Sequence, residues 1–559
     1  MKSNTIKIAA LSAKADAGEN SFAFAITARA ASILDVPEIM DINIGPSNIL
    51  ICVADELEDF TFNCRSKTII LVYDYTKEAY ACRKFAYDYA DACLTLSKEV
   101  ASRLRLLHPN VLYASSGGQA LQNIMSYGAR WPSSELSKLR GEIVPRSMTI
   151  LFVTNDFRVG GLEQVVINLA SLAKSLGHRP IISYAGIIED MTRKAVENAG
   201  IEHERLPEGF EARKAFLRGR NVSIVNAHYA TILARESHDL GIPYLQTIHN
   251  MYLWLDEAGL AEWRELDTLT SGYIAVSANA AMVADLRLGL SPEKMVIVPN
   301  GITLTKRKLN CPAECDVALR QELGIPPEGI VFVQVASLNG VKAHTLTVRA
   351  FAEALRSRDD IYLILLGKET DPGYGCLVRK AIELYNIGSH VLMPGYREDV
   401  HRFLNLARAV VAPSFVEGWS LAINEALQFG VPVIATDVGG ACEQLRGKDN
   451  IILPAFLKHS ESISAKDFFD SLTDESLCRS VSPRLAEAFL IKAKQSRRTS
   501  SEANVGNIPL SRDAYMAHIN IMQRLIQNKS IIPLRRETYI KQKSNGFVPA
   551  GANKWESYF

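Results

Sequence analysis

The sequence predicts an α/β fold of two facing Rossmann-like lobes, preceded by an extra Rossmann-like domain at the N-terminus. Buried-strand patterns alternate with amphipathic helix patterns between residues 148 and 456, which is typical of parallel sheets covered by helices on both faces. A charged, proline-containing segment divides this alternation into two sets. A weaker version of the first set lies before residue 148.

The middle set begins with the strand pattern "MTILFVTNDF", a glycine turn at Gly160 and Gly161, and the helix pattern "GLEQVVINLASLAKSLGH". Apolar residues recur at helical spacing along that helix. The later strand patterns of this set are "PIISYAG", "VSIVNAH", "PYLQTIH", "GYIAVS" and "KMVIVPNG". We therefore predict a first lobe over residues 148–305 and a linker over residues 306–328.

A second set of strands and helices begins near residue 329. Its strand patterns are "GIVFVQVAS", "IYLILLG", "HVLMPG", "AVVAPS" and "VPVIATD", with helix patterns between them. Beyond residue 456 the periodicity fades, although "AYMAHINIMQRLIQ" has the pattern of an amphipathic helix. We predict a second lobe over residues 329–527 and a basic tail over residues 528–559.

The first 147 residues resemble the middle set. Residues 6–35 can be laid over residues 149–178, which pairs Ala17-Gly18 with the Gly160-Gly161 turn, and a later alignment places Ser97 on Ser277. Two interpretations stay open: a degenerate duplicate of the first lobe, or chance similarity between two βα domains.

Composition excludes several classes of protein. The 62 basic and 61 acidic residues give a net charge of +1, so nucleic acid is not an expected partner. The nine cysteines show neither a zinc pattern nor a disulfide framework, and no apolar run is long enough for a membrane span. We expect a cytoplasmic protein. Its basic tail is either solvated or in peripheral contact with an anionic inner-membrane surface.

Ligands of open α/β sheets bind beyond the carboxyl ends of the strands. Gly160 and Gly161 lie there and open a helix, so they either make a simple turn or bring backbone amides close to an anion. No Gly-x-Gly-x-x-Gly follows a strand and no Walker A motif is present, which argues against a dehydrogenase and a nucleoside triphosphatase.

Residues 413–443 carry the strongest chemical signal. A strand ends at Ser414, Glu417 and Gly418 follow in a loop, and Glu425 lies in the next helix. Carboxylates accept hydrogen bonds from hydroxyl groups, as a sugar or a ribose requires. Helix amides and a cation such as Lys342 suit a diphosphate. Polyhydroxyl and diphosphate together describe a nucleotide sugar.

These segments resemble glycosyltransferase family 4, the retaining enzymes of the glycosyl transferases group 1 with the GT-B fold. The matching pieces are "VGGLEQVVINLASLAKSLGH", "VPNGI", "VKAHTLTVRAF" and "GYREDVHRFLNLARAVVAPSFVEGWSLAINEALQFGVPVIATDVGGACEQL", in the family's order. The resemblance covers residues 148 to about 456.

The resemblance implies a role for each matching site residue. Glu425 would bind the donor ribose, Glu417 the hydroxyls of the transferred sugar, and Lys342 the phosphate charge. His249 in "TIHN" would lie beside the reacting sugar; a hydrogen-bonded structural histidine is the equally weighted alternative. The remaining donor contacts implied in this way are Gly160, Gly161, Gly418, Ser420 and Leu421.

Three departures from the family's pattern concern the phosphate site. Ser337 stands where the family usually has an arginine, Ala343 replaces the glycine after the lysine, and the glutamate loop has Ser420 and Ala422. Loss of one cation weakens the stabilisation of a leaving diphosphate. Lys368 and Arg397 are candidates to compensate.

Further candidates lie in the first lobe. Asp156, Arg158 and Glu163 are expected in an exposed loop, where they would contact the acceptor. His228 in "VNAHYA" is expected to be structural.

The function that these observations predict is transfer of a sugar from a nucleoside diphosphate donor, such as a UDP- or GDP-sugar, to a hydroxyl acceptor, with retention of configuration. The acceptor would be a glycan, a lipid-linked molecule or another hydroxyl compound in polysaccharide, lipopolysaccharide or glycoconjugate biosynthesis. We expect no cofactor and no required metal. Two alternatives remain, a weak or inactive nucleotide-sugar-binding scaffold and a nucleotide-sugar epimerase.

Overall fold

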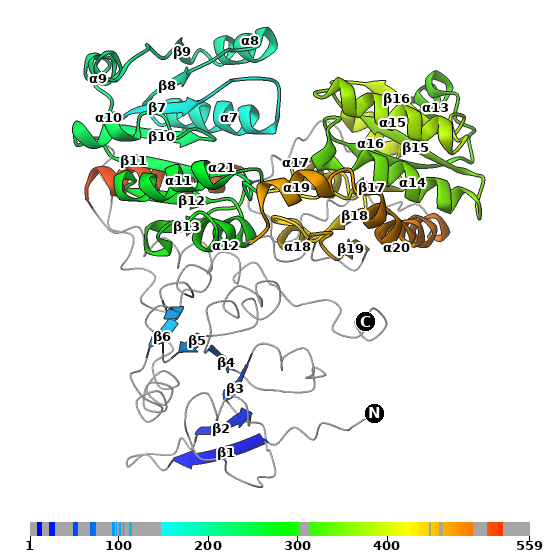
Figure 1. The fold of residues 1–559 in the computed structure, drawn as a ribbon, viewed down its shortest axis with the longest axis horizontal. Coiled ribbons are helices and arrows are strands. Elements are labelled where there is room, and N and C mark those ends of the chain that lie inside the picture. Colours follow the sequence, from blue (N-terminus) through cyan, green and yellow to red (C-terminus); the bar gives the residue numbers. More distant parts are fainter. Residues whose placement is uncertain are drawn as a thin grey trace. The chain divides into compact units, whose positions relative to one another are not determined.

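The computed structural model of the 559-residue chain describes residues 147–301, 313–445, 449–457, 462–495 and 511–528. Before residue 147 it describes six strands and residues 97, 100, 101 and 104. The chain divides into two compact units. The first comprises Met1–Met148, Ser291–Ile297 and Gln527–Phe559, and the second comprises Thr149–Leu290 and Val298–Ile526. Figure 1 labels their elements.

The six strands of the first unit form one sheet in the order β1-β2-β3-β4-β5-β6. They are β1 (Ile8–Ala13), β2 (Phe22–Thr27), β3 (Ile49–Val53), β4 (Thr68–Tyr73), β5 (Ala92–Thr95) and β6 (Val111–Tyr113). The strands from β2 to β6 pair in parallel, whereas β1 is antiparallel to β2. The division also assigns the short strand β13 (Met295–Ile297) to this unit.

The proposed repeat is partly wrong in its alignment. Laying residues 6–35 over residues 149–178 places a helix over Phe22–Thr27, but these residues form β2. Alternating phenylalanine and small residues in "FAFAIT" suit a strand better than the helix that the alignment requires.

The second alignment agrees better with the structure. Ser97 Oγ accepts a hydrogen bond from the Val100 amide at 3.2 Å, and Ser277 Oγ accepts one from the Ala280 amide at 3.0 Å. Each serine follows a strand of the same length, β5 or β12 (Gly272–Ala275). Whether the two regions arose by duplication stays a prediction.

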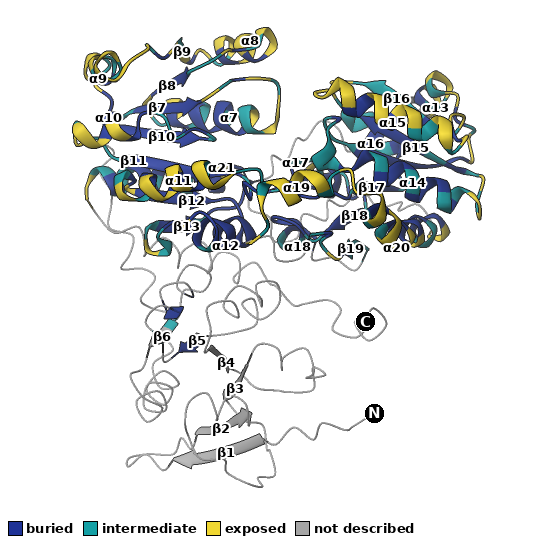
Figure 2. Ribbon diagram, in the orientation of Figure 1, coloured by how far each residue is buried: buried dark blue, intermediate teal, exposed yellow. Residues whose placement is uncertain are grey.

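The first lobe of the second unit, residues 149–290, is a parallel sheet with helices around it. Its strands follow one another in the order β12-β11-β10-β7-β8-β9. They are β7 (Thr149–Thr154), β8 (Arg179–Tyr184), β9 (Glu202–Arg205), β10 (Ile224–His228), β11 (Tyr244–Ile248) and β12. The helices are α7 (Gly161–Ser175), α8 (Asp190–Asn198), α9 (Phe210–Gly219), α10 (Ala234–Asp239), α11 (Glu257–Leu269) and α12 (Ala278–Leu286). Figure 2 shows buried strands and exposed outer helix faces.

The second lobe, residues 313–495, repeats this architecture with a parallel sheet in the order β16-β15-β14-β17-β18-β19. Its strands are β14 (Ile330–Val335), β15 (Ile361–Leu366), β16 (Val391–Gly395), β17 (Ala409–Ala412), β18 (Val433–Thr436) and β19 (Ile451–Leu453). Its helices are α13 (Ala313–Leu323), α14 (His344–Leu355), α15 (Pro372–Leu384), α16 (Val400–Leu406), α17 (Leu421–Gln428), α18 (Ala441–Gln444), α19 (Ala465–Ser471) and α20 (Glu475–Lys494). The two parallel-sheet lobes confirm the predicted pair of Rossmann-like lobes, whereas the Rossmann-like character of the N-terminal domain stays a prediction.

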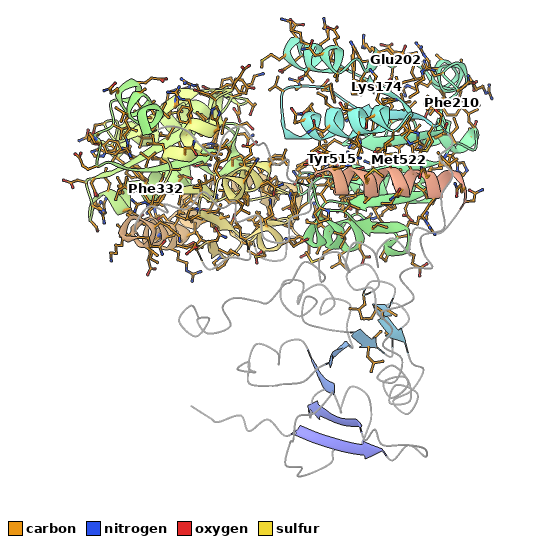
Figure 3. All side chains as sticks on the ribbon, turned by 180° about the vertical axis from the view of Figure 1, so that it is seen from behind. Lys174, Glu202, Phe210, Phe332, Tyr515 and Met522 are labelled. Carbon is orange, nitrogen blue, oxygen red and sulfur yellow. The ribbon has the colours of Figure 1, made fainter. Side chains whose placement is uncertain are left out.

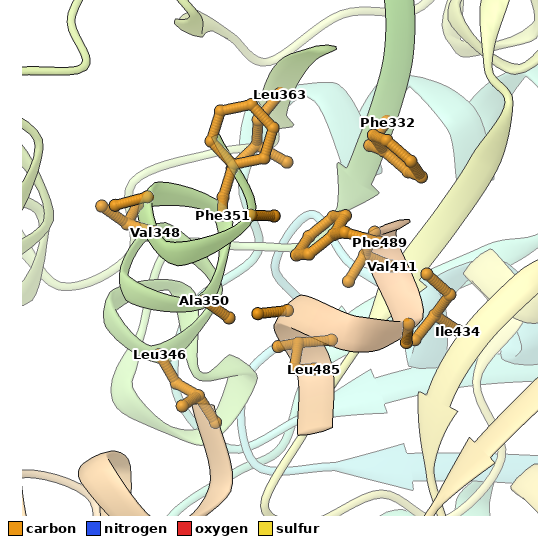
Figure 4. Packing of buried hydrophobic residues seen from close by; sticks show 14 of the residues in the cluster. Phe332, Leu346, Val348, Ala350, Phe351, Leu363, Val411, Ile434, Leu485 and Phe489 are labelled. Atoms are coloured by element: carbon orange, nitrogen blue, oxygen red, sulfur yellow. The ribbon is translucent and has the colours of Figure 1, made fainter. Parts of the chain in front are cut away.

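Three aromatic rings pack together in the core of the second lobe (Figure 4). Phe489 on α20 packs edge-on against Phe332 of β14, with ring centroids 4.8 Å apart, and against Phe351 of α14, at 5.6 Å. Edge-to-face contacts at this spacing are favourable beyond the area they bury. The core therefore ties α14 and α20 to the start of the strand that leads to Lys342.

The last described helix, α21 (Ser511–Ile526), packs against α7 of the first lobe. Its residues Tyr515 and Met522 are labelled in Figure 3. Met522 and Ile519 are fully buried. Although α21 follows the second lobe in sequence, its apolar face completes the first lobe. Among the described helices, none combines the length and apolarity needed to cross a membrane.

Candidate active site

Two helices of different lobes begin side by side. Gly160 precedes α7 and offers no side chain to cap its amides, whereas Ser420 caps α17 by accepting a hydrogen bond from the Ile423 amide. A Cβ atom on Gly161 would lie 3.0 Å from the Leu421 side chain. Since helix N-termini carry partial positive charge and free amides, this junction suits an anion.

Lys342, Ser414 and Glu417 form a polar group beside this junction. Lys342 ends a short 3-10 helix (Gly340–Lys342), and its ammonium group donates a hydrogen bond to Glu417 Oε1. Ser414 Oγ donates to the same oxygen at 2.9 Å. Lys342 and Glu417 both keep part of their side-chain surface exposed, 24% and 15%. The carboxylate is therefore held in one place and remains reachable.

The backbone conformation of Ala343 shows why a glycine would suit the position after Lys342. Its backbone has φ 54° and ψ 38°, the left-handed conformation that favours glycine. The alanine methyl group is buried in the core of the second lobe, so packing of that methyl group offsets part of the backbone strain.

The loop after β17 lies directly against the end of β11. A Cβ atom on Gly418 would fall 1.8 Å from the backbone oxygen of His249. A Cβ atom on Gly439 would fall 2.5 Å from the backbone oxygen of Glu417. Only residues without a side chain allow these approaches. Two of the predicted site residues, Gly418 and His249, are thus brought together.

Asn424 on α17 adds another link between the lobes. Its amide nitrogen donates hydrogen bonds to the backbone oxygens of Asn300, at 3.4 Å, and Gly301, at 3.3 Å. The "VPNGI" motif of the sequence therefore contacts the helix that carries Glu425.

His249 belongs to a buried group of aromatic rings. Its Nε2 lies 2.7 Å from Nδ1 of His228, and its ring stacks on Tyr229 with centroids 5.7 Å apart. Burial and the nearby His518 lower the pKa of His249 to about 3. Burial likewise holds the pKa of His228 well below its ordinary value. Both imidazoles are therefore neutral near pH 7.

Glu425 has an exposed side chain on α17. Surrounding protein atoms nevertheless raise the pKa of its carboxyl group through partial desolvation. The group can therefore reach a ligand while being poorly hydrated itself, which favours a hydrogen bond to a hydroxyl group.

The other predicted cations lie elsewhere. Lys368 pairs with Glu189 of the first lobe, with 3.0 Å between Nζ and Oε2, and Arg397 pairs with Asp399 and Glu322. Within the described residues neither contacts Lys342 or Glu417. Ser337 lies just after β14. A Cβ atom on Gly367, just after β15, would fall 2.0 Å from the backbone oxygen of Ala336, so the ends of β14 and β15 lie against each other at this point.

The predicted acceptor residues form a small network on the first lobe. Arg158 pairs with Asp156, and its amide donates to Glu163 Oε1 at 3.3 Å. The hydrogen bond that the Ile187 amide donates to the Asp156 carboxylate is the main cause that lowers the pKa of Asp156. Burial raises the pKa of Glu163. Asp156 and Arg158 precede α7, whereas Glu163 lies in the first turn of that helix, beside Gly160, and not in a loop as expected from the sequence.

Sequence reasoning missed several residues of this region. Ser414 and Gly439 were within the quoted motif, so their position after strands was a usable signal. Glu189, Asn226 and His518 had no local signal, because only the tertiary fold brings them to the site. Within the described residues, no cluster of three or more His, Cys, Asp or Glu side chains could hold a metal ion.

Two family models match the chain in adjoining segments. The model described as Glycosyltransferase Family 4 matches residues 159–306, and the one described as Glycosyl transferases group 1 matches residues 317–466. Together they cover most of the two lobes and more than half of the chain.

Curated relatives are similar over part of their length. The D-inositol 3-phosphate glycosyltransferase of Kineococcus radiotolerans is 32% identical over 162 residues, which are 27% of this chain and 36% of that protein. The Segniliparus rotundus protein of the same name is 26% identical over 220 residues, 36% of this chain and 47% of that protein. The chain thus matches between about a third and a half of their length.

Solved structures support the fold. A glycosyltransferase from Rickettsia africae has a TM-score of 0.53 at 18% identity, covering 69% of this chain and all of that one. The Anabaena protein HepE, in complex with UDP, has a TM-score of 0.51 at 16% identity, with 71% of this chain and all of that chain covered.

Proposed function

Because the chain belongs to glycosyltransferase family 4, with the two lobes of the GT-B fold, we propose that it transfers a sugar from a nucleoside diphosphate to a hydroxyl acceptor with retention of configuration. The observation that carries this proposal is the meeting of the α7 and α17 N-termini, at Gly161 and Leu421, beside Lys342 and Glu417. Amides and a cation suit the diphosphate, and the carboxylate suits the sugar hydroxyls.

The donor would lie along α17. Its diphosphate would contact the amides near Ser420 and Leu421, its sugar would face Glu417, and its ribose would reach Glu425. Lys342, now paired with Glu417, would share its charge with the phosphates as negative charge develops on the leaving group. HepE, of the same fold, is described with UDP, which supports testing uridine donors first.

Catalysis would come chiefly from positioning and from charge stabilisation. Glu417 is held by two hydrogen bonds, so a sugar bound to it has a fixed orientation. The leaving phosphate would take the proton of the acceptor hydroxyl, which requires no protein base and no metal ion. The acceptor would bind near Arg158 and Glu163 and would be a glycan, a lipid-linked molecule or another hydroxyl compound of a glycoconjugate pathway.

We also propose a cytoplasmic location, with peripheral membrane contact through the basic tail. That tail, residues 528–559, lies almost entirely outside the described residues. Co-sedimentation of the full chain with vesicles that contain anionic lipid tests the contact. Binding that is absent even at low salt would contradict it.

A second candidate function is a nucleotide-sugar-binding scaffold. Ser337, in place of a cation, favours it, as does the pairing of Lys368 and Arg397 with carboxylates. The scaffold would bind a donor without turning it over.

Donor turnover separates the two functions. The full chain is incubated with UDP-, GDP- and ADP-sugars and a pool of candidate glycan and lipid acceptors, and release of the nucleoside diphosphate is measured together with sugar transfer. We expect transfer from one donor class. Binding without release from every bound donor would favour the scaffold, and absence of both would contradict the proposal.

A further inference from the structure

Asn226 begins a chain of hydrogen bonds that ends at His249. Its amide nitrogen donates to the Leu245 oxygen at 3.2 Å and to Thr247 Oγ1 at 3.0 Å. Its carbonyl oxygen therefore faces His228 Nε2, at 3.1 Å. A carbonyl oxygen only accepts hydrogen bonds, so His228 must carry its proton on Nε2.

The same reasoning fixes the proton of His249. Burial keeps the His228 ring neutral, so its single proton is on Nε2 and its Nδ1 is an acceptor. His249 Nε2 lies 2.7 Å from that acceptor, which requires an N–H on His249 Nε2. The opposite tautomer would bring two lone pairs together in a buried contact, and leaving buried acceptors unpaired is costly.

The second nitrogen of His249 is then left as an acceptor. Within the described residues Nδ1 makes no hydrogen bond, and His249 retains 8% of its surface exposed, whereas His228 is fully buried. Stacking on His228 and Tyr229, at interplanar angles of 29° and 20°, restricts rotation of the His249 ring. The His249 backbone oxygen in turn lies against Gly418, next to the sugar-binding candidate Glu417.

We propose that His228 is a positioning residue that, with Asn226, holds His249 in the Nε2–H tautomer and so presents His249 Nδ1 as a hydrogen-bond acceptor for a substrate hydroxyl group. This inference rests on the proposed function only for the identity of the hydroxyl compound. It assigns His228 a role beyond the structural one expected from the sequence, and that role is exerted through His249 because His228 itself is fully buried.

Other titratable groups face the histidine pair. Tyr229 and Tyr252 surround it from the loops after β10 and β11, and His518 faces it from α21. Burial and, to a smaller extent, the negative charges of Glu417 and Glu163 raise the pKa of Tyr229. Burial lowers the pKa of His518 to about 4, so near pH 7 none of the three histidines carries a positive charge that would reverse the tautomer.

Nitrogen NMR tests the proposal directly. The full chain is labelled with ¹⁵N at its 11 histidines, and solid-state spectra distinguish protonated from unprotonated ring nitrogens. Comparison with His249→Gln assigns the His249 signals. We expect a neutral Nε2–H ring from pH 5 to pH 8. A predominant Nδ1–H tautomer or an imidazolium at pH 7 would overturn the proposal, whether or not the protein turns over a donor.

Two variants test the role of His228. His228→Leu removes the acceptor and should shift the His249 tautomer ratio at least about tenfold, whereas His228→Gln keeps an amide oxygen in its place and should retain the ratio. If donor turnover is measurable, kcat should fall at least tenfold in His228→Leu with little change in the donor KM and recover in His228→Gln. An unchanged tautomer and kcat in His228→Leu would overturn the positioning role. The wild-type spectrum decides the tautomer if a variant does not fold.

Discussion

At the scale of single residues, the contact between Gly418 and His249 imposes the strictest steric requirement of the site. A side chain at Gly418 would meet backbone, 1.8 Å from the His249 oxygen, so no rotamer change can relieve the clash. The requirement explains why a glycine directly follows the sugar-binding candidate Glu417.

Gly418→Ala should therefore displace the glutamate loop from His249. We expect donor turnover to fall at least about tenfold and the free energy of unfolding to drop by roughly 1–3 kcal/mol, as for an overpacked core. Turnover and denaturant unfolding measure both effects. The matched control is Gly219→Ala, where a Cβ atom meets nothing within 4 Å. Equal behaviour of the two variants would contradict the assigned contact.

At the scale of elements, α21 contributes a buried histidine to the first lobe. His518 is 1% exposed, and its Nδ1 has no hydrogen-bond partner among the described residues. Its folded-state pKa of about 4 lies below the ordinary value near 6.5. Between these two values the unfolded chain binds a proton that the folded chain does not.

Stability should therefore rise with pH through this window and level off above about pH 6.5, as far as histidines contribute. His518→Leu should lower the slope by up to about 1.4 kcal/mol per pH unit. Denaturant unfolding of the full chain from pH 4.5 to pH 7.5 measures the slope. Met522→Leu, which changes a buried residue of α21 that does not titrate, should leave the slope unchanged; if both variants give the wild-type slope, His518 does not titrate as described.

The sequence predicts some elements well because their signals are local. The β7–α7 unit shows a buried strand, a glycine turn and helical periodicity, and all three lie where predicted. α20 was missed because Ser480, Ser482 and Pro483 interrupt the apolar pattern of "ESLCRSVSPRLAEAFLIKAK", although Phe489 is central to the core. Tertiary packing stabilises this helix despite its weak local pattern.

Some residues of the candidate site could likewise be predicted from local sequence, and others could not. Glu417, Gly418, Glu425 and Lys342 could be chosen from the sequence because each lies in a motif after a strand. The hydrogen bond between His228 and His249 joins residues 21 positions apart, and His518 comes from a helix near the end of the chain. No local pattern specifies such contacts, because they depend on strand order and on the path of α21.

At the scale of the whole second unit, an ion pair joins the two lobes. Lys368 lies 3.0 Å from Glu189, and the two side chains are 46% and 25% exposed. Exposed pairs contribute roughly 0–1 kcal/mol, so this one can strengthen the contact between the lobes without determining their fold.

Exchanging the charges tests whether Lys368 serves the contact between the lobes or phosphate binding. Lys368→Glu alone should reduce stability by less than about 1 kcal/mol, and adding Glu189→Lys should restore it. If Lys368 also contacts the donor phosphate, the exchanged pair will still bind the donor more weakly. Thermal unfolding and donor titration measure the two effects; a stability loss that the second substitution does not reverse would contradict the ion pair.

The role of the first unit stays a prediction. Its six strands form one sheet, and we predict that this unit binds a partner or a second copy of the chain, or contributes to acceptor binding. Removing residues 1–147 and measuring transfer to a natural acceptor tests an essential acceptor role, which full activity would exclude.

The central claim is that the N-terminus of α17 (Leu421–Gln428), together with Glu425 on that helix, binds a nucleoside diphosphate. Calorimetric titration of the full chain with UDP, GDP and ADP tests it most directly. We predict saturable binding of at least one nucleotide, weakened at least about tenfold in Glu425→Ala and unchanged in Glu383→Ala, at an exposed glutamate of α15. Absence of binding by all three nucleotides, or equal binding by the two variants, would contradict the account.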